Sequence, residues 1–247
     1  METHLEMENQ IARVKAFIQN AKKITVLTGA GISHESGIPT FRGQDGLWKK
    51  FRAEDLATNQ AFQSNPKLVW EWYDWRRGLI RKVKPNAGHY ALVSMENHIS
   101  SFTLITQNVD GLHRLAGSKN VFELHGNIWR VKCLNCHAVY DNFEVPISKD
   151  MLPRCKHCGG LIRPDVVWFG ESLPENTLKA AMESAIHCNL MLVVGTSGIV
   201  QPVASLPSLA KSKNAYIIEV NPNQTPISLL ADESIRGKAA ETLPGLV

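Results

Sequence analysis

The 247-residue sequence has few cysteines, no long apolar run and no block of like charge, and each absence excludes a class of protein. Five cysteines are too few for a disulfide scaffold. The formal net charge of +4 is not gathered into a run of like charges, so nucleic acid is not indicated as an obligate partner. The first ten residues are polar and acidic, and no later segment reaches membrane-spanning length. We therefore expect a cytoplasmic protein with no membrane partner.

Short runs of aliphatic and β-branched residues alternate with segments of helical periodicity. The runs cover residues 24–28, 102–106, 190–194 and 215–220, and helices are expected at 11–21, 88–98 and 176–186. Strands that alternate with helices predict a Rossmann-like α/β fold, a doubly wound parallel sheet. Ligands of such sheets bind beyond the carboxyl ends of the strands. Because each run ends in a polar or glycine-containing turn, we expect these turns to converge on one crevice.

Two segments interrupt this alternation. Residues 49–85 are helical and rich in tryptophan, and residues 129–165 contain the paired cysteines. We interpret both as modules inserted into one domain that spans residues 1–247. The nucleotide-binding part then consists of residues 1–48, 86–128 and 166–247. A chain of this length is compatible with one large α/β domain.

The strand at 24–28 runs directly into a glycine-rich turn that begins with Gly29-Ala30-Gly31. Bare backbone can approach a pyrophosphate closely, and the N–H groups of a following helix attract its charge. The pattern is therefore typical of a nucleotide site. It departs from the dinucleotide fingerprint, because His34 stands where that fingerprint has a third glycine. A glycine turn of an ordinary α/β domain stays open as the alternative.

Four of the five cysteines form two close pairs, separated by eighteen residues. The pairs are Cys133-x-x-Cys136 and Cys155-x-x-Cys158. This spacing is typical of a zinc site made from two knuckles, and four thiolates leave no position for water, so the metal is expected to be structural. Two disulfides and a zinc ribbon that contacts nucleic acid are the competing interpretations. His137 and His157 are extra candidate ligands.

Polar groups that suit proton transfer and amide binding lie close together in the sequence. His125 precedes a glycine on the crevice side of the sheet, and a neutral imidazole can take a proton from a hydroxyl at physiological pH. His113 is a minor rival for this role. The turn Gln107-Asn108-Val109-Asp110 offers two amides and a carboxylate that can hold a carboxamide such as nicotinamide. A turn that only caps the next helix is the alternative.

A tryptophan-rich helix is expected from Pro66 through Pro85, with a polar cap before it. Its apolar face has Arg76 near its middle and Tyr73 three residues earlier. Arginine and tyrosine can bind one carboxylate together. The alternative is an internal partner, Asp55 or Glu54. The remaining basic side chains are expected to form a solvated rim; these are Arg77, Arg81, Lys82 and Lys84.

Taken together, these motifs resemble those of the sirtuins, NAD-dependent protein lysine deacylases. The matching motifs are Gly29-Ala-Gly-Ile-Ser33, Glu35-Ser-Gly-Ile-Pro39, Phe41-Arg42, Gln107-Asn-Val-Asp110, His125-Gly126, the paired cysteines, Val167-Trp-Phe-Gly-Glu171, Gly195-Thr-Ser197 and Asn221. They cover nearly the whole chain in the expected order. The Tyr73-x-x-Arg76 pair further resembles the class III branch, similar to sirtuin 5 and its bacterial and archaeal relatives, which remove succinyl, malonyl and glutaryl groups. His34 is a departure, because the family usually has alanine there.

The resemblance implies an NAD-consuming reaction on acyl-lysine proteins or peptides. In this reaction the acyl carbonyl oxygen attacks the ribose carbon that bears nicotinamide, and His125 deprotonates a ribose hydroxyl. The products are nicotinamide, free lysine and an O-acyl-ADP-ribose. The peptide is expected to add as a strand beside residues 167–171. NAD as cosubstrate and one structural zinc ion are the implied small-molecule partners.

The resemblance also assigns residues to roles. It implies that His125, Asn108 and Arg42 are catalytic. It implies an NAD site formed by Gly29, Ala30, Gly31, Ser33, Glu35, Pro39, Phe41, Arg42, Trp48, Gln107, Asn108, Val109, Asp110, His125, Gly195, Thr196, Ser197, Asn221, Pro222, Asn223 and Ala239. It implies a substrate site formed by Tyr73, Arg76, Val167, Trp168, Phe169, Gly170 and Glu171. The zinc ligands are Cys133, Cys136, Cys155 and Cys158.

Four other functions stay open at this stage. A plain lysine deacetylase would leave Tyr73 and Arg76 without a role in selectivity. A protein mono-ADP-ribosyltransferase would use the same crevice. An NAD-dependent oxidoreductase would need a ribose-binding acid after the glycines, and Asp45 and Asp55 lie in range without ending a second expected strand. A zinc-ribbon binding module would be indifferent to replacement of His125.

Overall fold

The computed structural model describes residues 2–40, 52–147 and 151–247. Its main feature is a six-stranded parallel sheet with the order β3-β2-β1-β7-β8-β9. The strands are β1 (Lys23–Thr28), β2 (Ser101–Thr106), β3 (Val121–Glu123), β7 (Leu190–Val194), β8 (Tyr216–Val220) and β9 (Glu233–Ile235). The doubly wound α/β fold expected from the alternation of strands and helices is therefore confirmed.

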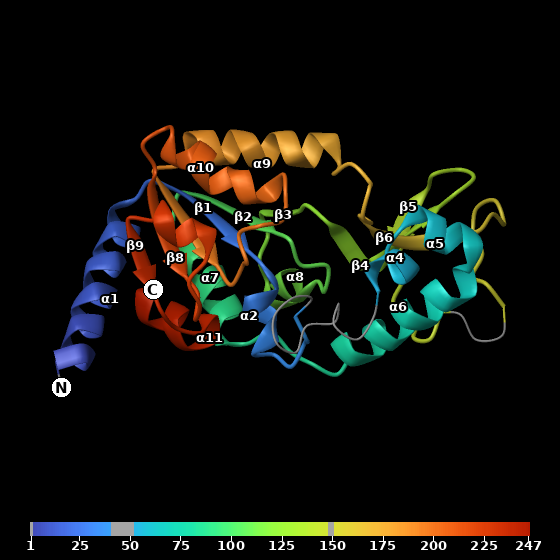
Figure 1. Ribbon diagram of the computed structural model, residues 1–247, viewed down its shortest axis with the longest axis horizontal. Helices are drawn as coiled ribbons and strands as arrows, with labels where there is room; N and C mark the ends of the chain where they lie inside the picture. The colour runs from blue at the N-terminus through green and yellow to red at the C-terminus, as the bar shows by residue number, and fades with distance from the viewer. Residues whose placement is uncertain (1, 41–51, 148–150) are drawn as a thin grey trace.

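Helices cover both faces of this sheet (Figure 1). On one face lie α1 (Glu2–Asn20), α7 (Ala87–His98) and α11 (Ala239–Thr242), and on the other lie α9 (Glu175–His187) and α10 (Leu206–Lys211). The central strands are buried on both faces, which explains their nearly continuous aliphatic sequence. Two clusters of aliphatic side chains, one on each face, form the core of this part. We call the sheet and these helices the large lobe.

A second, smaller sheet has the order β5-β4-β6 and is antiparallel. Its strands are β4 (Gly126–Cys133), β5 (Val139–Asp141) and β6 (Ile162–Val166), and it packs against α4 (Ala53–Leu56), α5 (Asn59–Ser64) and α6 (Pro66–Ile80). One hydrophobic cluster joins Trp70 of α6 to Cys133 and Ile162 of the small sheet. The two segments that interrupt the alternation thus share one core. We call this unit the small lobe.

The tryptophan-rich helix α6 begins as the sequence predicts and ends earlier. Asn65 caps it by accepting a hydrogen bond from Leu68 N, and Pro66 occupies the first turn. The helix ends at Ile80, because Lys82 N and Val83 N bond to the carbonyl oxygens three residues back and tighten the chain. The remaining elements are α2 (Ala30–His34), α8 (Leu112–Ala116), η1 (Val203–Ser205), η2 (Pro226–Leu229) and η3 (Leu243–Leu246). No helix in the described ranges has the length and apolar character to cross a lipid bilayer.

Candidate functional site

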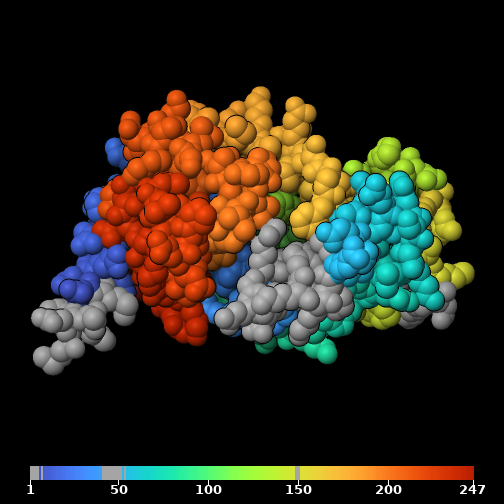
Figure 2. Space-filling view, viewed as in Figure 1, coloured from blue at the N-terminus to red at the C-terminus, as the bar shows by residue number. Residues whose placement is uncertain are grey.

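A cavity of about 1240 Å³ opens where the carboxyl ends of β1, β2, β7 and β8 meet the small lobe. In the sheet, β2 and β3 lie on one side of β1, and β7, β8 and β9 lie on the other side. The cavity therefore lies at the point where the strand order reverses. On the face shown in Figure 2, the orange and red C-terminal segments and the cyan segment of α4–α6 lie on either side of the middle of the molecule. The turns that were expected to converge do so here.

The cavity brings together most of the residues singled out from the sequence. From the NAD set, its lining includes Gly29, Ala30, Gly31, Glu35, Gln107, Asn108, Val109, His125, Gly195, Thr196, Ser197, Asn221, Pro222, Asn223 and Ala239. From the substrate set, it includes Tyr73, Arg76, Val167, Trp168, Phe169, Gly170 and Glu171. Ser33, Pro39 and Asp110 are not among the lining residues. Phe41, Arg42 and Trp48 lie outside the described residues.

The glycines of the β1 turn allow two loops to approach each other closely. Gly31 N donates to Gly195 O over 2.8 Å, and a Cβ on Gly31 would lie 2.6 Å from Gly195 Cα. Gly195 itself has a φ of +58°. Gly29 meets the same loop, since its Cβ would lie 2.8 Å from Thr196. The glycines are therefore required by the packing of the β1 turn on the β7 turn, whether or not a phosphate also needs them.

The turn after β2 is tied to both neighbouring strand ends. Gln107 Nε2 donates to Thr196 Oγ1 over 2.9 Å, and Asn108 Nδ2 donates to Gly29 O over 3.0 Å. Asn108 Nδ2 also contacts Ser33 Oγ at 3.1 Å, which fixes the orientation of the amide. The amide oxygen of Asn108 is then the atom of this side chain that is left to accept from a cavity occupant.

Asp110 lies behind the cavity lining, where it is fully buried. Leu112 N donates to its Oδ1 over 2.8 Å. Burial raises the pKa of Asp110, against hydrogen bonds from Leu112 and Ser33 that lower it. The positive charge of Arg76 lowers it further, so the two side chains influence each other across the junction of the lobes.

His125 follows β3 and is held by one hydrogen bond in a single tautomer. Its Nδ1 lies 3.0 Å from the carbonyl oxygen of Gln107, which can only accept, so Nδ1 carries the hydrogen. Nε2 is then the bare nitrogen of a ring that lines the cavity. Burial lowers the pKa of His125 below its usual value of 6.5, more than the Gln107 contact raises it. The ring is therefore neutral at pH 7 and can accept a proton at Nε2.

Tyr73 and Arg76 of α6 line the part of the cavity walled by the small lobe. Their side chains are 3% and 4% exposed. Burial lowers the pKa of Arg76 to about 10, opposed by Tyr73 and Asp110, so the guanidinium stays charged at neutral pH. The suggested internal partners lie elsewhere, because Glu54 and Asp55 are exposed beside Arg52. The structure thus buries a cation at the wall of a cavity.

Arg77 contradicts the expectation of a solvated rim. Its side chain is fully buried between Trp70 and Trp129, with the guanidinium carbon 5.6 and 5.7 Å from the two ring centroids. Nε donates to Ile128 O over 2.8 Å, and Nη1 donates to Asn142 Oδ1 over 2.8 Å. The sequence pattern grouped Arg77 with the basic side chains outside the apolar face. A helical wheel does not show Ile128 O and Asn142 Oδ1 of the small lobe, which accept hydrogen bonds from the buried guanidinium.

The segment after β6 runs beside the cavity and is held by an ion pair. Both carboxylate oxygens of Glu171 accept from the guanidinium of Arg163, and one of them also accepts from Trp168 N over 2.8 Å. Burial would raise the pKa of Glu171, but the Arg163 hydrogen bonds lower it overall. Phe169 N donates to Ala57 O over 2.9 Å. The backbone path of residues 167–171 is thereby fixed.

Some lining residues escaped the sequence reasoning. Ala57 and Trp72 line the cavity together with Tyr73 and Arg76. Further such residues are Thr40, Val166, Leu173, Leu178, Val200, Gln201, Pro202 and Thr225. The position of Trp72 on the α6 wheel was a usable signal. Nothing in the local sequence of Ala57 marks it.

Glu35 and Asn221 shape the cavity through internal contacts. Glu35 Oε2 accepts from Ala240 N over 2.9 Å, so this carboxylate supports the first turn of α11. Asn221 Nδ2 donates to Thr196 O over 2.8 Å and so joins the β8 turn to the β7 turn. Behind Asn221, the fully buried carboxylate of Glu219 accepts from Arg236 Nη1 over 2.9 Å. Arg236 Nη1 in turn lies 3.0 Å from Asn223 O.

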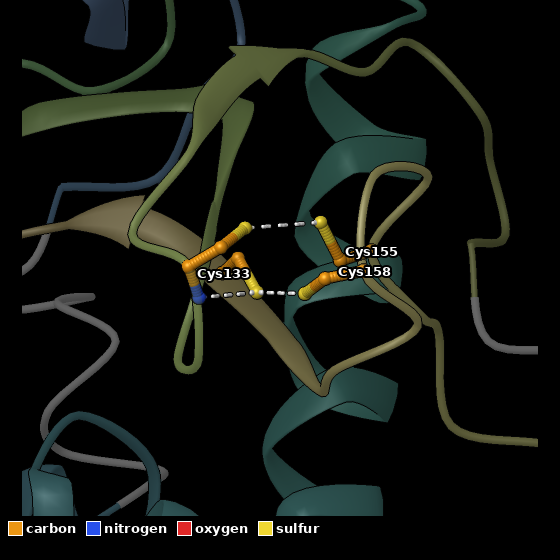
Figure 3. Close-up of side chains that lie close together, drawn as sticks. Cys133, Cys155 and Cys158 are labelled. Atoms are coloured by element: carbon orange, nitrogen blue, oxygen red, sulfur yellow. Dashed lines mark hydrogen bonds between the residues drawn. The ribbon is translucent and has the colours of Figure 1, made fainter.

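The four paired cysteines gather in the small lobe, away from the cavity. Their Sγ atoms all lie within 4.8 Å of one another. Cys133 Sγ is 3.5 Å from Cys158 Sγ, and Cys136 Sγ is 3.7 Å from Cys155 Sγ (Figure 3). All five cysteines are free thiols, which excludes the two-disulfide interpretation. The cluster does not include His137 or His157.

The cluster has the donor set and the surroundings of a structural zinc site. The N–H groups of Asn135 and Cys136 point at Cys133 Sγ, and that of His157 points at Cys155 Sγ. These hydrogen bonds, that of Cys136 first, lower the pKa of the Cys133 thiol to about 6. Four sulfur ligands complete the tetrahedral shell of zinc. The site therefore fits the metal that the sequence predicts.

Comparison with known proteins identifies the group to which this architecture belongs. The profile of the Sir2 family matches residues 29–202. An NAD-dependent protein deacylase of Aquifex aeolicus is 57% identical over 89% of this chain and 92% of its own. An NAD-dependent protein deacylase of Pyrococcus abyssi is 51% identical over 96% of both chains. The crystal structure of a Sir2 homolog–NAD complex superimposes with a TM-score of 0.90 at 46% identity, covering 95% of this chain and 91% of the other. The chain belongs to the Sir2 family.

Proposed function

We propose that this Sir2-family protein is an NAD-dependent deacylase that favours lysine acyl groups ending in a carboxylate, such as succinyl, malonyl and glutaryl. The observation that carries the acyl preference is the buried guanidinium of Arg76 beside the hydroxyl of Tyr73 at the cavity wall. A guanidinium donates charge-assisted hydrogen bonds that a carboxylate can accept in a paired geometry, and the tyrosine hydroxyl can add a further donor. An acyl group that ends in a carboxylate offers these acceptors, and an acetyl group does not.

The crevice fits NAD as cosubstrate. Its volume of about 1240 Å³ exceeds the roughly 300–1,000 Å³ of common ligand pockets, which leaves room for a dinucleotide and a lysine side chain together. In this proposal the turns at 29–31 and 195–197 hold the phosphates, and those at 221–223 with Ala239 hold the adenosine side. NAD supplies an electrophilic ribose carbon from which nicotinamide departs.

His125 is proposed as the general base. Its ring lines the cavity and is oriented by the Gln107 contact, which leaves Nε2 unprotonated at neutral pH. It would take the proton of a ribose hydroxyl at Nε2 and become an imidazolium that the Gln107 carbonyl stabilises. His113, the rival candidate, is fully buried and its Nε2 is hydrogen-bonded to Thr28 Oγ1, so it supports the sheet end from behind.

The nicotinamide subsite is proposed at the turn after β2. Asn108 offers its amide oxygen to the cavity, because its N–H₂ group is used by Gly29 and Ser33. Asp110 and Ser33 act from behind the lining through their contact with this turn. The roles of Phe41, Arg42 and Trp48 rest on the resemblance alone, as does that of Pro39.

The acyl-lysine peptide is proposed to lie beside residues 167–171. In this segment Val167 N and Phe169 N already donate to His125 O and Ala57 O. Trp168 N donates to the Glu171 side chain. A peptide strand added here would therefore be held mainly through the carbonyl oxygens of the segment, a mode that tolerates many side-chain sequences.

The zinc site is proposed to be structural. All four ligands are cysteines, so a bound ion would have no open position for substrate or water. The division into a nucleotide-binding part with two inserted modules and the cytoplasmic location remain predictions from the sequence.

Plain deacetylation is the second candidate, since an acetyl group can enter a cavity that it does not fill. The oxidoreductase is not favoured, because Asp55 lies in α4 and not at the end of a second strand, while Asp45 lies outside the described residues. Protein mono-ADP-ribosylation would use the same base and the same NAD site.

The test measures nicotinamide release and peptide mass with NAD and matched succinyl-lysine and acetyl-lysine peptides. Faster loss of the succinyl group is expected. Faster loss of acetyl would support the deacetylase and return Tyr73 and Arg76 to a structural role. A mass gain of ADP-ribose on the peptide would support the transferase instead.

A further inference from the structure

A buried hydrogen bond joins Tyr73 of α6 to Trp168 in the segment after β6. Trp168 Nε1 lies 2.9 Å from Tyr73 Oη, and the two residues are 2% and 3% exposed. An indole N–H can only donate, so the tyrosine oxygen is the acceptor. The direction of this hydrogen bond follows from the chemistry of the two groups and needs no observed hydrogen position.

The direction of this hydrogen bond determines whether the tyrosine hydroxyl can donate to a ligand in the cavity. A hydroxyl has one hydrogen and two lone pairs, and Trp168 occupies one lone pair. Within the described ranges, Trp168 is the only hydrogen-bond partner of Tyr73 Oη. Burial raises the pKa of Tyr73 above 10, more than Trp168 and Arg76 lower it, so the hydroxyl keeps its hydrogen at neutral pH. That hydrogen is available to an occupant of the cavity.

The indole is held firmly enough to impose this direction. The guanidinium carbon of Arg163 lies 3.3 Å from the Trp168 ring centroid, and the Phe62 ring lies 5.3 Å away on a tilted plane. Arg163 is itself fixed by both oxygens of Glu171, and Glu171 accepts from Trp168 N. The ring and its own backbone are therefore anchored to the same ion pair.

We propose that Trp168 is a positioning residue for acyl selectivity: its N–H fixes the Tyr73 hydroxyl as a hydrogen-bond donor toward the cavity. Together with Arg76, the acyl end of the cavity then presents donors. A carboxylate, which has only acceptors, is favoured there, whereas a terminal amide brings donors of its own and is disfavoured. The inference rests on the proposed function, because it assumes that the acyl group reaches Tyr73 and Arg76.

The test replaces Trp168 with phenylalanine, which keeps an aromatic ring for Arg163 but removes the N–H group together with part of the buried indole ring. For Trp168→Phe we expect the ratio of kcat/KM for succinyl over acetyl peptide to fall about five- to tenfold, the range for one hydrogen bond that orients a donor to a charge. Acetyl turnover serves as the internal control for the peptide segment. A succinamyl-lysine peptide, the neutral amide of the same size, should lose less turnover than the succinyl peptide, because its terminal group carries donors as well as an acceptor.

Tyr73→Phe is the matched variant, and the double variant completes the cycle. If Trp168 acts through the Tyr73 hydroxyl, Trp168→Phe changes the succinyl over acetyl ratio less than about twofold once Tyr73 is phenylalanine. An undiminished change in that background would overturn the inference. So would an equal loss of both activities, which a merely structural tryptophan predicts.

An NMR readout keeps this test separate from the proposed function. In protein labelled with ¹⁵N-tryptophan, the indole N–H peak of Trp168 is identified as the one that is missing from the spectrum of Trp168→Phe. This peak should shift in Tyr73→Phe, because that variant removes the hydrogen-bond acceptor of the indole. No shift would contradict the hydrogen bond whatever the substrate. If the wild-type enzyme prefers the acetyl peptide, the proposed acyl preference is wrong. If the wild type prefers the succinyl peptide and Trp168→Phe keeps that preference unchanged, only the proposed role of Trp168 is wrong.

Discussion

The interiors of the two lobes differ in kind. The large lobe is filled by aliphatic side chains on both faces of its sheet. The small lobe is filled by Phe62, Tyr73 and several tryptophans, and it buries three guanidinium groups, those of Arg76, Arg77 and Arg163. Aliphatic packing is non-directional, whereas each buried guanidinium needs acceptors at fixed places.

The difference indicates how the work of the molecule is divided. The large lobe provides the strand ends and the His125 ring, which any acyl substrate would use. The small lobe provides a cation and a hydroxyl whose orientation depends on contacts among residues far apart in the sequence. We therefore expect changes in the large lobe to affect all acyl substrates alike, and changes in the small lobe to affect either folding or the choice of substrate.

The largest effect is expected from Cys133→Ser. Loss of one thiolate breaks the tetrahedral shell, and structural zinc contributes on the order of 10–16 kcal/mol to the folding of small metal modules. The small lobe should lose zinc and cooperative folding, measured as zinc content and thermal unfolding. Cys188→Ser, which changes the fifth cysteine in the large lobe, is the control and should retain both. A stable metal-free Cys133→Ser protein would contradict the structural role of the site.

The next effect is expected from His125→Ala. Removing a general base costs roughly 10²–10⁴-fold in turnover, and the loss should be the same for succinyl and acetyl peptides. NAD binding, measured by calorimetry, should persist. His98→Ala, at an exposed position on α7, is the control. A loss of turnover with only one of the two acyl peptides would contradict the expectation that changes in the large lobe affect all acyl substrates alike.

Adjacent arginines on α6 sharpen the comparison within the small lobe. Arg76→Met should lower succinyl turnover at least about 30-fold, since losing one partner of a buried charge pair costs about 2–5 kcal/mol, and should leave acetyl turnover within a fewfold. Arg77→Met should leave the ratio unchanged and lower the free energy of unfolding by about 2–4 kcal/mol, because Ile128 O and Asn142 Oδ1 lose their donor. Steady-state kinetics and urea unfolding measure the two. If Arg77→Met lowered the succinyl over acetyl ratio and Arg76→Met lowered only the free energy of unfolding, the roles assigned to the two arginines would be wrong.

The stability of the large lobe is expected to fall in acid because of His89. Burial lowers its pKa from 6.5 to about 4, and burial with the neighbouring His89 lowers that of His113 as well. Between pH 6.5 and 4 the unfolded chain binds a proton that the folded chain excludes, so stability is full above pH 6.5 and is lost as the pH falls through this window. His89 alone accounts for up to about 3 kcal/mol.

Urea unfolding of the wild type and of His89→Gln across this range measures the effect. The variant removes the titrating group, so the two unfolding free energies should converge as the pH falls from 7 to 4. Parallel curves would exclude His89 as a cause of the acid sensitivity.

The smallest effect is expected from Glu219→Gln. The carboxylate of Glu219 holds Arg236, whose guanidinium supports the backbone of Asn223 at the cavity edge. The amide weakens this ion pair, so KM for NAD should rise about three- to tenfold with little change in kcat. Steady-state kinetics at saturating peptide separate the two constants. A fall in kcat without a change in KM would contradict a role limited to the nucleotide side.

The sequence predicted the large lobe well because its signals are local. A run such as residues 190–194 is buried on both faces, and only a central strand of a parallel sheet is apolar throughout over so short a length. The zinc cluster was predictable for the same reason, because Cys133 and Cys136 lie in one turn and carry their spacing in the sequence. The capped start of α6 at Asn65 is a third example.

The sequence alone determined the fold class, the family and most of the residues that converge on the crevice, since each of these follows from short motifs in a known order. Only the tertiary structure decided which charged groups are buried and which way they point. Arg76 and Arg77 are neighbours with the same chemistry, yet one lines the cavity and the other binds oxygens of the small sheet. The hydrogen-bond partners Ile128 and Asn142 of Arg77 lie more than fifty residues away in the sequence, and no local pattern records the direction in which a buried side chain finds its acceptor.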